Sequence, residues 1–550
     1  METINSAPTQ APEDKRNAIA NSGIVTFRAF ALGLILCVFV GALNSWLATV
    51  YQVHMVGGIQ MPFVPLFILL VLIIGVNVAL RALSHFTSIR PFSAVELVTF
   101  YGMMLFGGLI STPGCDNTFI TNGPGLFYFS SAENKWASLF YQYVPTWFAP
   151  GWNGVRFQKD VIDQLYLGGL SFNQIPWHAW AVMLIAWSIF LGFAYAVLFF
   201  TALLFRRHWI EHEALAFPLV EVPLQMVERG EDESHPISSD FWSNRLMWLG
   251  LGIAFFIHFF KGMNAIYPDW PVFPVNQFGS ISIAFTERPW NAIPSFKAEL
   301  FLGGIGIAYL LTREISFSFW FFFLAGLFEY ALAQMLGFSV ADMKRPGAVN
   351  FIMAQNTGAW LMMALLLIWT AREHIIRIAK AAWNPRGAQM DEPFSARSII
   401  LGLLLSFLGL LFWSWFAGIN VLIALVFLAT FVLVSLVLSR MVIEGGFMFP
   451  QVPFGALNLM MGSTVGYQAI GASSLTKLSF MQSVILGDMR TNILPAFLNV
   501  MKMAHELRLE RKQLRRLLLC CVVAVFVTFA VTIFTTVYGL YSHGGLQSYG

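Results

Sequence analysis

The sequence predicts an all-α, polytopic helical membrane protein. Hydrophobic residues make up 57% of its 550 residues and charged residues only 11%, whereas soluble domains carry roughly 25% charged residues. The apolar residues form separate runs that are as long as the ~20 residues a helix needs to cross a bilayer core. Runs such as 419–438 and 517–534 show no period-two alternation, so they predict helices and not the strands of a membrane barrel.

Eleven stretches are predicted to span the membrane, and broken or re-entrant helices bring the expected total to about 12–16 segments. The spans are 28–50, 62–84, 94–113, 178–205, 246–265, 298–312, 315–337, 349–371, 398–417, 419–439 and 517–541. Residues 1–24 are polar and lack the apolar core of a signal peptide. They are expected to form a disordered cytosolic tail.

Basic residues predict the orientation of the chain. They cluster near Arg81 and Arg90, near Arg206 and Arg207, and within 372–397 and 502–516. The positive-inside rule places these loops and the N-terminus in the cytoplasm, with 114–177 and 266–297 outside. Two basic stretches, 371–383 and 501–516, have amphipathic spacing and are expected to lie along the inner membrane surface or to extend spans into water. The absence of organelle signals indicates a bacterial inner (cytoplasmic) membrane.

Several classes of function are excluded or disfavoured by the sequence. The net charge of +3 is too small to indicate a nucleic-acid partner. No Walker loop, nucleophile elbow or HExxH motif is present, so neither an enzyme nor a cofactor is expected. His208 and His212 share a helix face with Glu211 and could ligate a metal, but histidines at a membrane interface more often face water. No metal site is therefore predicted.

The region 441–500 and an apparent duplication suggest how the chain is organised. Region 441–500 is apolar but interrupted by glycine and proline, which predicts half-helices or a re-entrant hairpin near the functional centre. Two stretches, RHWIEHEALAFPLVEVP and RMVIEGGFMFPQVP, share Arg-x-x-x-Glu followed by Phe-Pro and Pro. Glu96 and Glu314 each begin an aromatic span. We therefore expect two related transmembrane halves, 25–245 and 246–550, with a parallel repeat favoured over an inverted one.

The candidate functional residues are polar groups within or beside the apolar spans, because an ionisable residue at membrane depth is costly and is a functional hypothesis by default. They are Glu444, Glu329, Glu314, Glu211, Gln355, Asn356, Asp488 and Arg490. All of them except Glu314 have a structural alternative. Glu444 and Glu211 could pair with an arginine one turn earlier, Glu329 could be a neutral acid bonded to a neighbouring helix, and Gln355 and Asn356 could bond between helices. Asp488 and Arg490 could form a gate or an ordinary loop pair.

Short motifs resemble the oligopeptide transporter superfamily. REISFSFWFFFLAGL is similar to an aromatic segment of that superfamily, and EHEALAFPLVEVPLQM and IEGGFMFPQVP are similar to its Glu and Phe-Pro segments. The first half, with RPFSAVELVTFYGMM, resembles uncharacterised bacterial membrane proteins related to the superfamily. The resemblance implies uptake of peptides or metal chelates, driven by protons.

We interpret the chain as a proton-coupled secondary transporter for small peptides or for peptide-like or metal-chelate solutes. The expected partners are the lipid bilayer, the solute, protons and a second copy in a homo-oligomer. Two other interpretations stay open at this point. One is a non-transporting scaffold or a subunit of a larger membrane complex, and the other is a membrane-embedded enzyme acting on lipid-linked substrates.

Overall fold

The structure is a computed structural model of the chain. It describes residues 24–53, 57–87, 89–111, 118–227, 240–271, 281–298, 302–338, 351–384, 392–452 and 466–548. The predicted cytosolic tail at 1–24 lies outside the described residues except for Ile24, as does the stretch 453–465 of the predicted broken region.

The all-α membrane fold is confirmed. Within the described residues nine helices are long and apolar enough to span a membrane. They are α2 (Phe27–Tyr51), α3 (Phe63–Val71) continued by the π-helical η1 (Leu72–Asn77) and α4 (Val78–Ser84), α9 (Trp177–Arg207) continued by the π-helical η5 (His208–His212), α12 (Arg245–Ile266), α15 (Arg313–Met335), α17 (Phe351–Trp383), α18 (Ala396–Phe416), α19 (Val421–Gly445) and α24 (Arg511–His543). The predicted 12–16 segments also include broken and re-entrant helices, which this number of long helices leaves out; α5 (Ala94–Ile110) is a shorter apolar helix beside them.

Shorter elements connect and cap these helices. The α-helices are α5 (Ala94–Ile110), α6 (Ile120–Tyr128), α7 (Trp136–Phe140), α8 (Lys159–Leu167), α10 (Pro218–Val227), α11 (Asp240–Ser243), α14 (Leu302–Tyr309), α21 (Tyr467–Ile470), α22 (Ala472–Ile485), α23 (Ile493–Glu506) and α25 (Gly545–Ser548). The 3-10 turns are η3 (Tyr141–Tyr143), η4 (Phe172–Gln174), η6 (Trp290–Ala292) and η8 (Met489–Thr491). Strands β1 (Ile281–Ile283) and β2 (Phe296–Ala298) form one short antiparallel pair, with Ser282 opposite Lys297.

Two predicted elements are wrong, and for a third the structure decides between the two predicted alternatives. The span expected at 298–312 is only the short helix α14, because eight residues rise about 12 Å and cannot cross a bilayer. The amphipathic helix expected at 501–516 does not exist as one unit, since α23 ends at Glu506 and α24 begins at Arg511. The basic stretch 371–383 extends α17 without a break.

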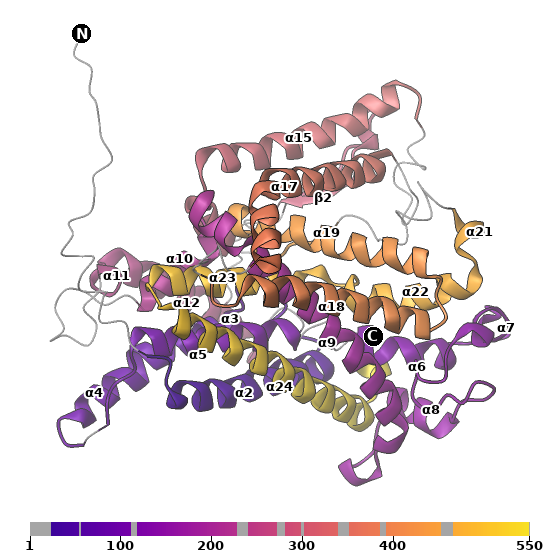
Figure 1. Cartoon of the computed structure of the whole chain (residues 1–550), viewed down its shortest axis with the longest axis horizontal. Coiled ribbons are helices and arrows are strands. Elements are labelled where there is room, and N and C mark those ends of the chain that lie inside the picture. Colours follow the sequence, from indigo (N-terminus) through magenta and orange to yellow (C-terminus); the bar gives the residue numbers. More distant parts are fainter. Residues whose placement is uncertain are drawn as a thin grey trace.

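Three parallel helices, α2, α5 and α24, form one layer of the bundle. At their first turns the Val25 N–H donates to Gln513, and Thr26 donates to Glu96 at 2.6 Å. Near their other ends Asn44 donates to Ser111. The helices therefore begin at the same end of the molecule and stay in contact along their length (Figure 1).

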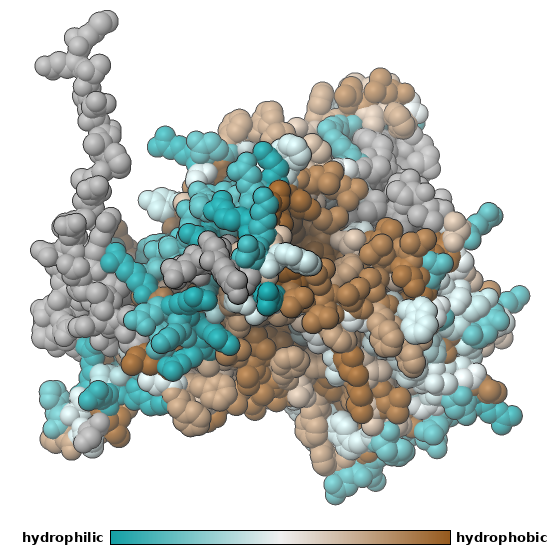
Figure 2. Space-filling view, viewed as in Figure 1, coloured by the Kyte–Doolittle hydropathy of each residue, from teal (hydrophilic) through white to brown (hydrophobic). Residues whose placement is uncertain are grey.

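In a second layer, α18 runs antiparallel to both α9 and α19, and α9 runs antiparallel to α24. Trp180 near the start of α9 donates to Tyr541 near the end of α24, and Trp413 near the end of α18 donates to the Ala186 carbonyl of α9. In Figure 1 these helices cross the view, α15 and α17 lie above them, and α6, α7 and α8 lie at the right. Figure 2 shows a hydrophobic band across the middle with hydrophilic residues toward the left and right ends.

The predicted basic loops lie at one end of the bundle, which we call the basic end. It holds the starts of α2, α5, α18 and α24 and the ends of α9 and α19, as the contacts of Arg28 with Glu96 and of Arg206 with Glu392 show. Residues 118–176, predicted to face the other side of the membrane, form the opposite end (Figure 1).

A sequence repeat that motif reasoning missed becomes evident from the helix starts. Pro-Phe-Ser-Ala occurs at 91–94 and again at 393–396, and Ser93 and Ser395 are the N-caps of α5 and α18. Each copy is followed by a helix leading away from the basic end and by another, α9 or α19, that returns and ends in Arg-x-x-x-Glu. The two copies thus have the same orientation. By this alignment the counterpart of Glu96 is Ser398, which replaces the suggested pairing with Glu314.

A backbone contact at the opposite end gives a first prediction. A Cβ added at Gly168 would lie 2.4 Å from the Gly544 nitrogen, and Gly168 has φ +76°. Gly169 has a similar φ of +87° with nothing within 4 Å. We expect Gly168→Ala to lower the thermal unfolding midpoint in detergent clearly more than Gly169→Ala, by the equivalent of about 1–3 kcal/mol of overpacking. Equal midpoints for the two variants would contradict the close contact.

Candidate functional site

Three irregular segments, 57–62, 446–452 and 486–492, meet about half-way along the bundle. Gln60 joins them. Its backbone N–H donates to the Met448 carbonyl at 2.9 Å, and its side-chain amide donates to the carbonyls of Arg490 at 2.7 Å and Asn492 at 3.0 Å. Gln60 is 1% exposed, and its side-chain oxygen has no hydrogen-bond partner among the described residues. A buried amide thus satisfies carbonyls that a broken helix leaves free.

The segment 486–492 interrupts a helix. α22 ends at Ile485 and α23 begins at Ile493, and the two follow one another across Figure 1. Asn492 caps α23 by accepting from the Leu494 N–H, and its side-chain amide donates to Ser435 of α19 at 2.8 Å. The prediction of half-helices within 441–500 agrees with this break, although the break lies beyond the glycine-rich part that suggested it.

Asp488 and Arg490, both predicted as site residues, pair inside this break. Arg490 donates from Nε to one Asp488 oxygen at 2.8 Å and from Nη2 to the other at 2.5 Å. The Asp488 side chain is 8% exposed and that of Arg490 is 18% exposed. A buried pair of this kind is costly to desolvate and weak evidence for stability. Its place between two half-helix ends favours a functional role.

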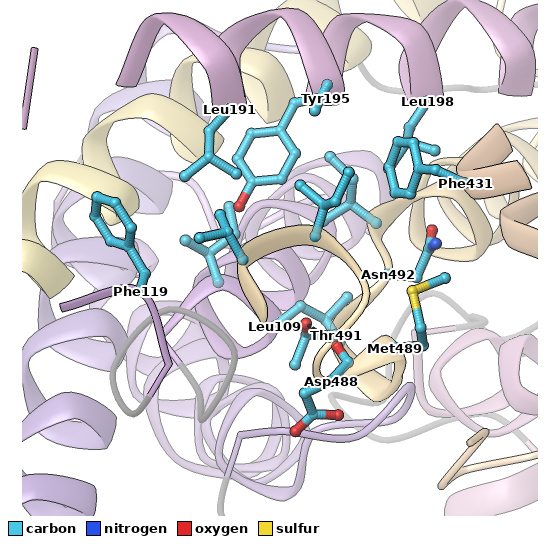
Figure 3. Close-up of a pocket in the computed structure, with 15 residues that line it drawn as sticks. Leu109, Phe119, Leu191, Tyr195, Leu198, Phe431, Asp488, Met489, Thr491 and Asn492 are labelled. Atoms are coloured by element: carbon cyan, nitrogen blue, oxygen red, sulfur yellow. Dashed lines mark hydrogen bonds between the residues drawn. The ribbon is translucent and has the colours of Figure 1, made fainter. Parts of the chain in front are cut away.

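A cavity of about 50 Å³ lies beside the break, between α5, α9 and α19. Figure 3 shows Leu191, Tyr195 and Leu198 of α9 on one side of it, with Leu109, Thr491 and Asn492 on the other. The Asp488 carboxylate points away from the centre of this cavity (Figure 3) and pairs with Arg490. The cavity is therefore mainly apolar and has room for about two water-sized groups.

The other side of the break packs against a second apolar cluster, separate from the main core. It is rich in methionine and joins α19 to α10 and α14. Its buried members are Ile59, Met61, Leu219, Ile307, Val434, Leu438, Val442, Met448 and Met489. Methionine side chains are unbranched and adapt to different neighbours, so this interface can rearrange more easily than a core of branched residues.

The two Arg-x-x-x-Glu motifs meet at the basic end. Arg440 pairs both with Glu444 in its own motif and with Glu213, two residues after the glutamate of the other motif. The Phe217 N–H donates to the Ile443 carbonyl at 2.9 Å. Glu444 thus forms the predicted ion pair with Arg440. Arg440 in addition connects the two motif-bearing stretches through Glu213.

The backbone beside this contact is strained. η5 is a π-helical turn at the end of α9, and π-bulges occur often at functional sites. Ala214 and Phe217 follow it with φ of +47° and +49°, values that residues with a side chain seldom adopt. Strain of this kind persists only where surrounding contacts maintain it.

A second, more deeply buried set of charges lies beside the first. Arg206 donates to Glu392 at 2.8 Å and pairs with Glu211 at 3.4 Å, and Arg207 donates to Glu211 at 3.0 Å. The side chains of Arg206 and Glu392 are 7% and 2% exposed. Burial raises the pKa of the Glu392 carboxyl above its ordinary value, although the nearby Arg206 opposes the shift. Glu211 therefore has the predicted arginine partner one turn earlier and shares Arg206 with Glu392.

Three histidines gather next to these charges. His208 Nε2 lies 2.8 Å from Glu213, and the His374 ring lies 5.8 Å from His208 and 6.2 Å from His212 between ring centroids. His374 contacts the Leu204 carbonyl at 3.0 Å. In the part of the chain that the structure describes, no group of three or more His, Cys, Asp or Glu side chains is arranged to hold a metal.

The remaining predicted residues lie away from the break. Gln355 of α17 donates to Glu329 of α15 at 3.3 Å, and Asn356 is half-buried beside it. This contact matches the interpretation of Glu329 and Gln355 as an interhelical hydrogen bond. Glu314 is exposed in the first turn of α15.

Apart from Glu314, the predicted residues therefore lie in three places: the break, the basic end and the α15–α17 contact. It also adds residues that sequence reasoning missed, namely Gln60, Glu213, Glu392 and His374. Gln60 had a usable signal, since VGGIQMPF places one amide between a Gly-Gly pair and the proline before an apolar span. Glu392 had none, because its partner Arg206 is far away in sequence.

Comparison with known proteins gives one match. A family model described as "Family of unknown function (DUF6785)" matches residues 20–550. No curated protein and no solved structure matches the chain.

Proposed function

The chain belongs to the family of unknown function DUF6785, and we propose that it is a secondary active transporter whose solute passes the α22–α23 break. The observation that carries the proposal is the meeting of three irregular segments at Gln60 beside the Asp488–Arg490 pair. Non-helical backbone half-way through a membrane protein is tolerated where it is buried in protein or lines a water-filled cavity. Discontinuous helices supply such sites in many secondary transporters.

The charges of the break match a solute that carries both signs. The Asp488 carboxylate and the Arg490 guanidinium neutralise each other. A zwitterion could exchange partners with them, its ammonium group taking Asp488 and its carboxylate taking Arg490. This chemistry suits the peptide-like solutes that the sequence resemblance implies. Coupling of their uptake to protons is a further part of the proposal.

The packing around the break would allow its two half-helices to move. A cavity of about 50 Å³ is too small for a dipeptide, so a solute of that size requires the half-helices to move apart. The methionine-rich cluster on one side and the small void on the other leave α22 and α23 room to shift. At the basic end, Arg440 closes the contact between the two motif copies and would have to release Glu213 in an open state.

The test is uptake into proteoliposomes of a mixed dipeptide and metal-chelate pool under an imposed proton gradient. Asp488→Asn keeps the shape of the side chain and its cap on the Arg490 N–H, but it leaves Arg490 without its anion. We expect uptake to fall at least tenfold, since a charge-assisted contact contributes about 1.5–3 kcal/mol. Glu373→Gln is the matched control, because Glu373 is 80% exposed at the basic end.

Two outcomes would count against the proposal. Accumulation of none of the solutes by folded wild-type protein would favour the scaffold interpretation. Accumulation by the wild type that Asp488→Asn leaves unchanged would place the solute path elsewhere. Glu329→Gln belongs in the same series, since uptake lost in that variant alone would move the path to the α15–α17 contact.

A further inference from the structure

In each of the two Pro-Phe-Ser-Ala copies, an arginine guanidinium lies over the ring of the phenylalanine. In the first copy the Arg28 guanidinium lies 4.8 Å from the centre of the Phe92 ring. In the second, the Arg515 guanidinium lies 5.3 Å from the centre of the Phe394 ring. The first arginine comes from α2 and the second from α24, so two unrelated helices supply the same group to equivalent places.

The copies differ in the anion that neutralises this cation. In the first copy Glu96, three residues after the cap, accepts from Arg28 at 2.7 and 3.3 Å. In the second copy Ser398 occupies that position and bonds to Ser395 at 2.7 Å. Among the residues that the structure describes, Arg515 has no carboxylate partner. The second copy thus keeps the cation and lacks its anion.

Further cations surround this place. Arg511, Lys512 and Arg516 are exposed with Arg515 at the start of α24, and Leu514, Leu517 and Leu518 are buried on the opposite face. Arg397 is exposed beside Ser398 and donates to the Ala382 carbonyl of α17. Basic residues close to the ends of two spans form a surface that attracts anionic headgroups.

An apolar path leads from these cations along α24. Leu519 and Val523 are 46% and 39% exposed, one and two turns beyond Arg515. Phe526, a further turn on, borders an open groove of about 640 Å³ that is lined by α9 from Leu184 to Ala196. The groove begins roughly 16 Å along the helix from Arg515, which an acyl chain can reach. A free phosphate would use the cations but not this groove.

We propose that the second Pro-Phe-Ser-Ala copy is a binding site for an anionic phospholipid. The headgroup phosphate takes the place that Glu96 takes in the first copy, against Arg515 and Arg397, and one acyl chain follows α24 into the groove beside α9. The fork of the arginine side chain matches phosphate oxygens well. This site is separate from the α22–α23 break and does not depend on the transport proposal.

The sharpest test restores the missing carboxylate. Ser398→Glu gives the second copy the Ser-x-x-Glu capping box that Ser93 and Glu96 form in the first, so the variant should fold at least as well as the wild type. Ser398→Gln gives a box of the same shape without the charge and is the matched control. Binding is measured by native mass spectrometry of the purified full chain with phosphatidylglycerol and with phosphatidylcholine of the same acyl chains.

We expect the wild type and Ser398→Gln to bind phosphatidylglycerol more tightly than phosphatidylcholine. Ser398→Glu and Arg515→Gln should each lower the affinity for phosphatidylglycerol at least about fivefold. Equal binding of the two lipids to the wild type would overturn the proposal. So would a Ser398→Glu protein that binds phosphatidylglycerol as well as Ser398→Gln does. Inorganic phosphate should not displace the lipid at equal concentration, and displacement would overturn the part played by the groove.

Discussion

Replacing Glu392 by methionine should destabilise the protein by about 3 kcal/mol, the low end of the range for breaking a buried ion pair. The change leaves Arg206, whose side chain is 7% exposed, without its 2.8 Å partner. An arginine cannot shed its proton to escape burial. Glu211, which lies 3.4 Å from Arg206, can replace only part of the lost interaction, because it also pairs with Arg207 and is more exposed than Glu392. The measurement is the thermal unfolding midpoint in detergent.

Two further variants separate the buried charge from a general loss of contacts. Arg206→Met together with Glu392→Met removes both charges and should recover most of the stability, since apolar replacements of buried pairs are often neutral or better. Glu506→Met is the control for an exposed ion pair. It removes the carboxylate that lies 2.6 Å from Lys502, and the Glu506 side chain is 46% exposed. That loss should stay below about 1 kcal/mol. A double variant no more stable than Glu392→Met would contradict the argument.

Replacing Gln60 by leucine should loosen the break and destabilise the protein by about 2–4 kcal/mol. The change removes the donor from two buried carbonyls, those of Arg490 and Asn492, and an unsatisfied buried acceptor costs about 1–3 kcal/mol. Leucine keeps the volume of the side chain and the backbone bond to Met448. Hydrogen exchange is the measurement, and amides of 486–494 should exchange faster than in the wild type.

Gln225→Leu is the matched control, because among the described residues the Gln225 side chain bonds only to exposed Glu221 on its own helix, at 2.7 Å. Its cost should stay below about 0.5 kcal/mol. The bond from Asn492 to Ser435 remains in Gln60→Leu and should keep α23 attached to α19. Unchanged exchange at 486–494 would show that Gln60 does not hold the break.

The sequence predicted the helical membrane class and the approximate position of most spans, since the apolar runs carry that information locally. The prediction for 298–312 was wrong because hydropathy does not register where a helix begins and ends: strand β2 occupies Phe296–Ala298, and α14 ends at Tyr309, before Thr312 caps α15. The resemblance to the oligopeptide transporter superfamily remains a prediction. So do the bacterial inner membrane, the orientation and the solute.

What the sequence determined by itself is therefore one-dimensional: which stretches enter the membrane, which loops carry basic charge, and that 441–500 cannot be one straight helix. Tertiary structure alone decided which polar groups meet. Asp488 and Arg490 are neighbours in sequence and could be paired in advance, whereas Gln60 reaches the same break across about 430 residues. The reason is physical: a buried polar group must find a partner in space, and no local pattern records which distant segment the packing of helices brings to it.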